Sequence, residues 1–112
     1  MTTDWDALPE NIKTFMTAVD VRDTDRALAT LTPDAVVTDE GHDYTGHGDI
    51  GTWIATAASE YTYTTELTGV TITESTVVVG QHLEGDFPGG VADLHYRFTL
   101  DGALIARLVI EP

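Results

Sequence analysis

The chain of 112 residues is long enough for one domain with a single core, over residues 1–112, and too short for two. Its hydrophobic content of 42% and charged content of 21% are typical of a globular protein, and the absence of cysteine excludes disulfides, thiol catalysis and thiolate metal sites. Nineteen acidic residues against five basic ones give a formal net charge of −14, which argues against nucleic acid and anionic membranes as partners.

Targeting and membrane segments are not evident in the sequence. The first ten residues carry neither a basic segment nor an apolar run of the kind found in signal peptides. No apolar stretch elsewhere is long enough to cross a bilayer. We therefore expect a soluble, cytoplasmic protein.

A helix is predicted over residues 9–21. Pro9 suits the first helical position, and Glu10 suits the positive end of the helix dipole. Apolar side chains recur at the spacings of one helix face, at Leu8, Ile12, Phe15, Met16 and Val19. We expect this stripe to lie in the core.

Two further helices are predicted before the main run of strands. A short one covers residues 24–31, capped by Asp23 or Thr24 and ended by Pro33. The third follows the segment TGHGD and repeats at helical spacings through Ile50, Trp53, Ile54, Ala57 and Ala58. Its small alanines indicate close packing on a sheet.

Beyond residue 60 the apolar pattern changes to the period of a β-strand. Apolar and polar residues alternate from Tyr61 to Leu67, and their parity then switches at Thr68 and Gly69, which predicts a bulge. TVVVGQHLE, VADLHYRFTL and ALIARLVI are the next three predicted strands. Helices followed by a run of antiparallel strands indicate an α+β domain, with helices covering one face of a curved sheet.

The last two strands form a predicted hairpin around the Asp-Gly pair at residues 101–102. A two-residue turn there places Tyr96 opposite Arg107, and directly opposed residues point to the same side of a sheet. The apolar residues on that side are Leu94, Phe98, Ile105 and Val109. Arg107 would then reach solvent past Tyr96, meet a carboxylate, or line a cavity and hold a ligand oxygen. The opposite side is half apolar and suits a dimer interface.

The segment AVVTDEGHDYTG, residues 35–46, runs from apolar residues into acids. Val36 and Val37 indicate a buried strand that ends near Asp39. Asp39 either caps the following loop or enters a pocket as a base, and the residues alone leave both open. His42 is a loop residue that can reach a pocket rim and exchange protons near neutral pH.

The remaining candidates are aromatic residues and histidines. Tyr44 and Trp53 are either core residues or a ligand platform. His82 shares a strand face with Val78 and Glu84 and is a candidate pocket residue. The four histidines have no spacing typical of a zinc or iron site, so we expect neither a metal nor a cofactor.

The segment FMTAVDVRDTDRALATLTPDAVVTDEGHDYTGHGDIGTW resembles the nuclear-transport-factor-two-like superfamily, in particular its SnoaL-like and ketosteroid-isomerase-like branches. HLEGDFPGG and DLHYRFTLDGALIARLVI resemble the closing hairpins of SnoaL-like members. The resemblance implies a cystatin-like cone: a strongly bent, mostly antiparallel sheet that wraps three N-terminal helices around a pocket. It also implies a homodimer formed through the outer face of the sheet.

The resemblance also implies roles for individual residues. In ketosteroid isomerase, an aspartate general base occupies the position that matches Asp39. The isomerase's two oxyanion donors match Phe15 and Leu94, which are apolar here. Tyr96 and Arg107 lie on the strands that line the family's pocket and are the candidate substitutes, with His82 or His42 as a proton relay.

We therefore expect a pocket for a small, mostly apolar, oxygenated molecule. The expected ligand-binding residues are Phe15, His42, Tyr44, Trp53, His82, Leu94 and Phe98. The expected chemistry is isomerisation, cyclisation or dehydration by proton transfer, without a cofactor. The alternatives are a ligand-binding or accessory dimer without turnover, and a structural dimer with a filled core.

Overall fold

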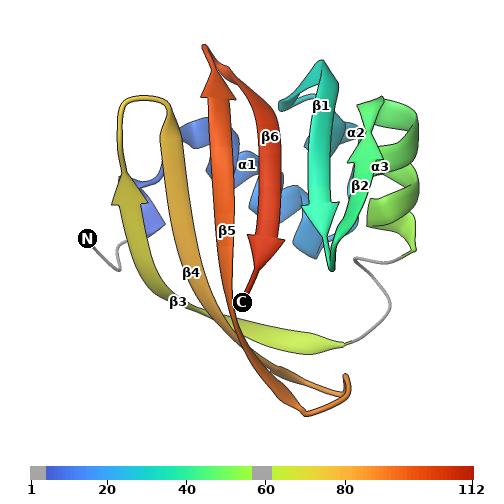
Figure 1. Cartoon of the computed structure of the whole chain (residues 1–112), viewed down its shortest axis with the longest axis vertical. Helices are drawn as coiled ribbons and strands as arrows, with labels where there is room; N and C mark the ends of the chain where they lie inside the picture. The colour runs from blue at the N-terminus through green and yellow to red at the C-terminus, as the bar shows by residue number, and fades with distance from the viewer. Residues whose placement is uncertain (1–4, 57–61) are drawn as a thin grey trace.

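Three helices pack on one face of a curved six-stranded sheet in the computed structural model, which describes residues 5–56 and 62–112 (Figure 1). The helices are α1 (Glu10–Asp20), α2 (Thr24–Leu28) and α3 (Gly46–Ala55), preceded by a short 3-10 turn at Trp5–Ala7. We call the sheet face that carries α1 and α2 the inner face, and the opposite one the outer face. The predicted α+β class is confirmed.

The sheet is mixed but mostly antiparallel. Its strands are β1 (Leu31–Asp39), β2 (His42–Thr45), β3 (Tyr63–Ile72), β4 (Thr76–Gly85), β5 (Val91–Asp101) and β6 (Leu104–Glu111). They lie in the order β2-β1-β6-β5-β4-β3, with only the β1–β6 pair parallel among the described strands. The chain thus brings its first long strand beside its last one.

The helices agree with the sequence pattern except at their ends. The Asp23 carboxylate accepts a hydrogen bond from the Arg26 N–H at 3.2 Å, as expected of the cap of α2. That helix is shorter than predicted because β1 already begins at Leu31. The third helix begins at Gly46, earlier than predicted, while Ala57 and Ala58 lie outside the described residues.

The predicted bulge in β3 is confirmed. Pairing with β4 shifts between Leu67 and Gly69, which leaves Thr68 unpaired. Gly80 of β4 faces this bulge, and a Cβ on it would lie 2.7 Å from Thr68 Oγ1. The glycine therefore allows the two backbones to approach where the strand changes parity.

Residues 42–45, which were expected to be loop, form β2. Glu40 and Gly41 both have positive φ, 52° and 78°, as a tight hairpin turn requires. This turn pairs Asp39 with His42, and Val37 with Tyr44 two residues earlier. The acid-rich segment is thus the tip of a hairpin.

The predicted pairing of the last hairpin is wrong. Asp101 pairs with Leu104, so the turn lies one residue later than expected, and a second shift leaves Ala106 unpaired. The Ile105 N–H donates to the Thr30 carbonyl at 2.8 Å, so the neighbouring segment holds β6 at this point. The residues that follow are consequently displaced relative to β5.

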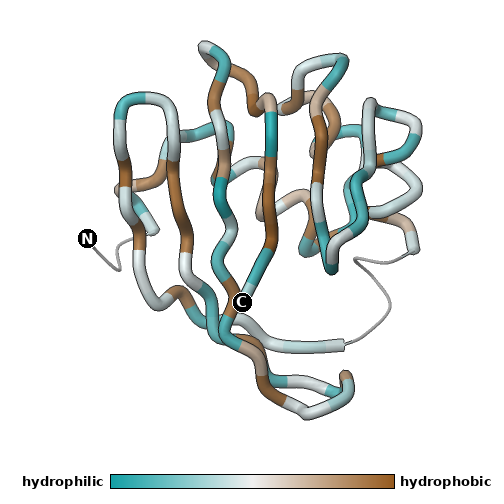
Figure 2. The backbone as a smooth tube through the Cα atoms, viewed as in Figure 1, coloured by the Kyte–Doolittle hydropathy of each residue, from teal (hydrophilic) through white to brown (hydrophobic). Residues whose placement is uncertain are grey.

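The core lies between the inner face and the helices. Runs of hydrophobic residues lie along β4 and β6 (Figure 2), and the members of these runs that face inward, such as Val77, Val79 and Leu108, are buried. Phe15 of α1 packs edge-on against Phe98 of β5, with ring centroids 6.0 Å apart. Fully buried residues around this pair include Ile12, Ile54, Val79, Ile105 and Leu108.

Candidate functional site

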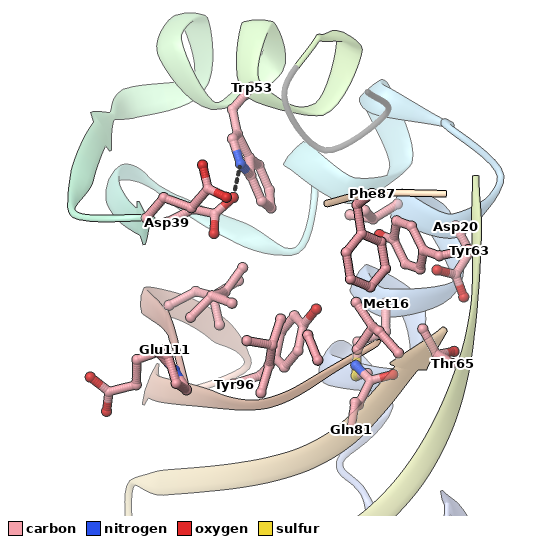
Figure 3. A pocket seen from close by; sticks show the side chains of 18 of the residues that line it. Met16, Asp20, Asp39, Trp53, Tyr63, Thr65, Gln81, Phe87, Tyr96 and Glu111 are labelled. Atoms are coloured by element: carbon pink, nitrogen blue, oxygen red, sulfur yellow. Dashed lines mark hydrogen bonds between the residues drawn. The ribbon is translucent and has the colours of Figure 1, made fainter. Parts of the chain in front are cut away.

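A cavity of about 660 Å³ lies between the inner face of the sheet and the helices (Figure 3). Its apolar wall includes Phe15, Met16, Trp53, Leu83, Leu94 and Leu108. Its polar groups come from Asp20, Asp39, Glu40, Tyr63, Thr65, Gln81, Tyr96 and Glu111. The volume and the few polar groups in apolar walls are typical of small-molecule sites.

Asp39 reaches this cavity from the last position of β1. Alternation along the strand places Val37 and Asp39 on the inner face, and Val37 is fully buried. The indole N–H of Trp53 in α3 donates a hydrogen bond of 3.1 Å to Asp39 Oδ2 (Figure 3). A carboxylate is therefore held at the cavity wall by a side chain that is itself buried.

Two tyrosines face the same cavity from β3 and β5, the strands on either side of β4. Burial raises the pKa of Tyr96, and the nearby charges of Tyr63, Asp39 and Asp20 raise it further. Burial likewise raises the pKa of Tyr63, ahead of the effects of Asp20 and Asp39. Both hydroxyls thus stay protonated at neutral pH and are available as hydrogen-bond donors.

Of the ten residues expected at the site, five line the cavity. They are Phe15, Asp39, Trp53, Leu94 and Tyr96. Phe98 is fully buried in the core instead, and Tyr44 packs beside Trp53 with ring centroids 6.2 Å apart. His42 pairs with Asp39 in the register of the hairpin, but its side chain is exposed and does not line the cavity.

The expectation that Arg107 faces the pocket is wrong. The corrected register pairs Arg107 with Thr99 of β5 and with Val36 of β1. Its exposed guanidinium points to the Thr38 hydroxyl at 3.5 Å, on the outer face, whereas Asp39 faces inward. The bulge at Ala106 reversed the parity on which the prediction depended.

The expectation that His82 lines the pocket is also wrong. In β4 the buried inner residues are Val77, Val79, Gln81 and Leu83, so the alternate position of His82 is on the outer face. Its Nδ1 lies 2.6 Å from Asp93 Oδ1, and its Nε2 lies 3.4 Å from Glu84 Oε2. The hydrogen bond with Asp93 is the main cause that raises the pKa of His82.

Six polar residues of the cavity were not predicted from the sequence: Asp20, Glu40, Tyr63, Thr65, Gln81 and Glu111. A signal for Gln81 was present, because it is the polar exception among the inner residues of an otherwise apolar strand. Asp20 ends α1 at an exposed position, and partial desolvation of its carboxyl raises the pKa. No local pattern marked it, since only the tertiary packing of the helices against the sheet brings it to the cavity lining.

The cavity is negatively charged. Four carboxylates line it, and none of the lining residues in the described part of the chain is a lysine, arginine or histidine. Exposed Asp20 and Glu40 mark its mouth. A ligand therefore meets acidic groups before it reaches the apolar walls.

Comparisons with known proteins identify the fold. The model of the SnoaL-like domain family matches residues 12–108. A protein named "putative polyketide cyclase" (SMa1630) from Sinorhizobium meliloti is 32% identical, with a TM-score of 0.88, over 99% of this chain and 100% of that one. No protein with a curated function matches the chain.

Two more distant structures share the fold alone. RV0760c from Mycobacterium tuberculosis, in complex with estradiol-17beta-hemisuccinate, has 14% identity and a TM-score of 0.73 over 91% of this chain and 90% of that one. A Catenulispora acidiphila protein with a ketosteroid isomerase-like fold, in complex with trimethylamine, has 15% identity and a TM-score of 0.80 over 95% and 87%. None of the described helices has the length and apolar character needed to cross a membrane.

Proposed function

We propose that the cavity binds a mostly apolar, oxygenated small molecule and that Asp39 removes a proton from this ligand. The proposal starts from the family: the chain belongs to the SnoaL-like family of the nuclear-transport-factor-two-like superfamily. The observation that carries this proposal is the position of Asp39 at the wall of the cavity, held through one oxygen by Trp53. Its other oxygen, Oδ1, receives no hydrogen bond from the described residues. That oxygen is free to accept a proton from a bound ligand.

The reaction class follows from the groups around Asp39. A carboxylate is a sufficient base for a C–H next to a carbonyl when a hydrogen-bond donor stabilises the enolate oxygen. The Tyr96 hydroxyl lines the same cavity and, with a raised pKa, donates rather than ionises. Proton removal by Asp39 and oxyanion stabilisation by Tyr96 support isomerisation, cyclisation or dehydration without a cofactor.

The ligand class follows from the walls and from the relatives. Aromatic and aliphatic side chains provide most of the lining, so the ligand buries a mostly apolar body. The 32% identical relative is named a cyclase of polyketides, and a structure with the same fold binds estradiol-17beta-hemisuccinate. Both names are consistent with a carbonyl- or hydroxyl-bearing molecule of this kind.

A second function, ligand binding without turnover, is favoured by the composition of the cavity. The family resemblance matches Phe15 and Leu94 to the isomerase's two oxyanion donors, and both are apolar residues of the cavity lining. Arg107, the other expected donor, lies on the outer face. The hydroxyl groups in the lining are those of Tyr63, Thr65 and Tyr96. A cavity that binds its ligand without an effective oxyanion donor would be a binding module.

One experiment separates the two functions. The chain has two tryptophans, so in Trp5→Phe the fluorescence of Trp53 reports on ligands in the cavity. With 2-tetralone as the probe in D2O, proton NMR follows exchange of the C–H next to the carbonyl. The C–H proton passes to Asp39, and the carbon takes up a deuteron from the solvent-exchanged acid.

We expect wild-type protein to accelerate this exchange and Asp39→Asn to lower the acceleration by about 100-fold or more. Asp34→Asn, at an exposed position of the same strand, is the matched control and should leave it unchanged. Quenching of Trp53 without exchange would support the binding module. If the protein showed neither quenching of Trp53 nor exchange of the probe, the proposed function would be contradicted.

A further inference from the structure

Gln81 is a buried polar residue whose side chain has no partner in the protein. It is 8% exposed, and it lies on the inner face of β4 between Val79 and Leu83. No hydrogen bond joins its amide to any other group of the described residues. Neither of its amide atoms is among the fully buried, unpartnered side-chain atoms of the described residues, which are Asn11 Oδ1 and Thr32 Oγ1, so the small exposed part of Gln81 includes its amide.

The Gln81 amide faces the cavity. Gln81 lines it from the wall across from Asp39 and Trp53, as Figure 3 shows. The side chain opposite it on β5 is Leu94, which offers no hydrogen bond. An amide placed there is satisfied only by what occupies the cavity, which is water or a polar group of a ligand.

The charge of the cavity restricts what that polar group is. Four carboxylates and no cationic side chain line the described part of the cavity, so an anionic group is repelled and finds no counter-ion. An amide offers both a donor and an acceptor, and it is neutral. It pairs well with a hydroxyl or a carbonyl.

We propose that Gln81 determines specificity by recognising an uncharged hydroxyl or carbonyl group on the end of the ligand remote from Asp39. This inference rests on the proposed function and narrows it. The ligand is then a neutral molecule with two oxygenated ends, one at Asp39 and one at Gln81, joined by an apolar body. An apolar molecule without the second oxygen leaves the amide unpaired and binds more weakly.

A matched set of three-ring probes tests this: phenanthrene, 9-phenanthrol and phenanthrene-9-carboxylate, titrated against Trp53 fluorescence in the Trp5→Phe background. We expect the phenol to bind about five- to tenfold more tightly than the hydrocarbon, as one hydrogen bond allows, and the carboxylate to bind weakest. Gln81→Met, which keeps the length of the side chain, should abolish the preference for the phenol while leaving phenanthrene affinity equal or higher.

Thr71→Val is the control, since it removes a hydroxyl at an exposed position of β3 that does not line the cavity. It should leave the preference for the phenol unchanged. Two results would overturn the role of Gln81 and leave the proposed function standing. One is that the protein with the wild-type Gln81 binds the phenol and the hydrocarbon equally tightly. The other is that Gln81→Met weakens the binding of all three probes by the same factor. If none of the three probes bound and 2-tetralone did not bind either, both the role of Gln81 and the proposed function would be overturned.

Discussion

The indole nitrogen of Trp53 lies 3.1 Å from Oδ2 of Asp39, and this hydrogen bond joins α3 to the end of β1 at the wall of the cavity. Trp53 is 3% exposed, so its N–H has little access to other partners. The bond fixes one oxygen of the carboxylate and leaves the other turned to the cavity. The same contact thus serves the packing of the helix and the orientation of the proposed base.

Trp53→Phe should lower the free energy of unfolding by about 2 kcal/mol, because it removes a hydrogen bond to a carboxylate and leaves space beside Asp39. Urea denaturation measures the change. Trp5→Phe is the matched control, at a position 37% exposed, and its effect should stay within about 0.5 kcal/mol. Equal losses in both variants would contradict the importance of the contact.

Arg107→Met should leave the affinity for cavity ligands and the rate of proton exchange unchanged within about twofold. The reason is that solvent and salt screen the electrostatic interaction between a charge on the outer face and a ligand in the cavity. Tyr96→Phe is the comparison, since it removes a hydroxyl that lines the cavity, and it should slow the exchange. Exchange kinetics with 2-tetralone provide the measurement. A loss in Arg107→Met as large as that in Tyr96→Phe would show that the arginine acts on the site.

Gly80→Ala should destabilise the protein by about 1–3 kcal/mol, because the new Cβ would lie 2.7 Å from Thr68 Oγ1. Adding Thr68→Ala should restore much of the loss. Gly48→Ala is the control: nothing lies within 4 Å of its added Cβ, and the residue is within α3. It should raise stability by up to about 1 kcal/mol. Thermal and urea unfolding check all three.

Stability should depend on pH through His82 and Asp93. The folded-state pKa of His82 is raised above its ordinary value of 6.5, so the folded protein binds this proton more tightly than the unfolded chain. The stabilisation is therefore complete below pH 6.5 and is lost as the pH rises through the raised pKa. Glu84, and Glu66 opposite His82 in β3, add negative charge around it.

His82→Gln should accordingly lower the melting temperature at pH 5.5 and have little effect at pH 9. Asp93→Asn should show the same pH dependence, since it removes the first cause of the raised pKa. High salt should reduce both effects, because the pair lies on the exposed face of the sheet. If the melting temperature fell as much at pH 9 as at pH 5.5, packing of the side chain would explain the loss instead of charge.

The elements that sequence periodicity predicted correctly depend on local contacts. Apolar spacing located α1, and the switch of parity at Thr68 located the bulge of β3, because each is a property of neighbouring residues. The alternation of β1 likewise brought Asp39 to the inner face two residues after Val37. The family resemblance then associated that position with a pocket.

Tertiary structure alone decided which way Arg107 points. A two-residue turn at the Asp-Gly pair was the favoured local solution, but Ile105 bonds to the Thr30 carbonyl, and Ala106 is left unpaired. A shift of one residue reverses every later side chain on the strand, so a contact made 75 residues away along the chain changed the proposed chemistry. Gln81 and Asp20 show the same limit: their types are plain in the sequence, but only the closure of helices over the sheet places them in one cavity.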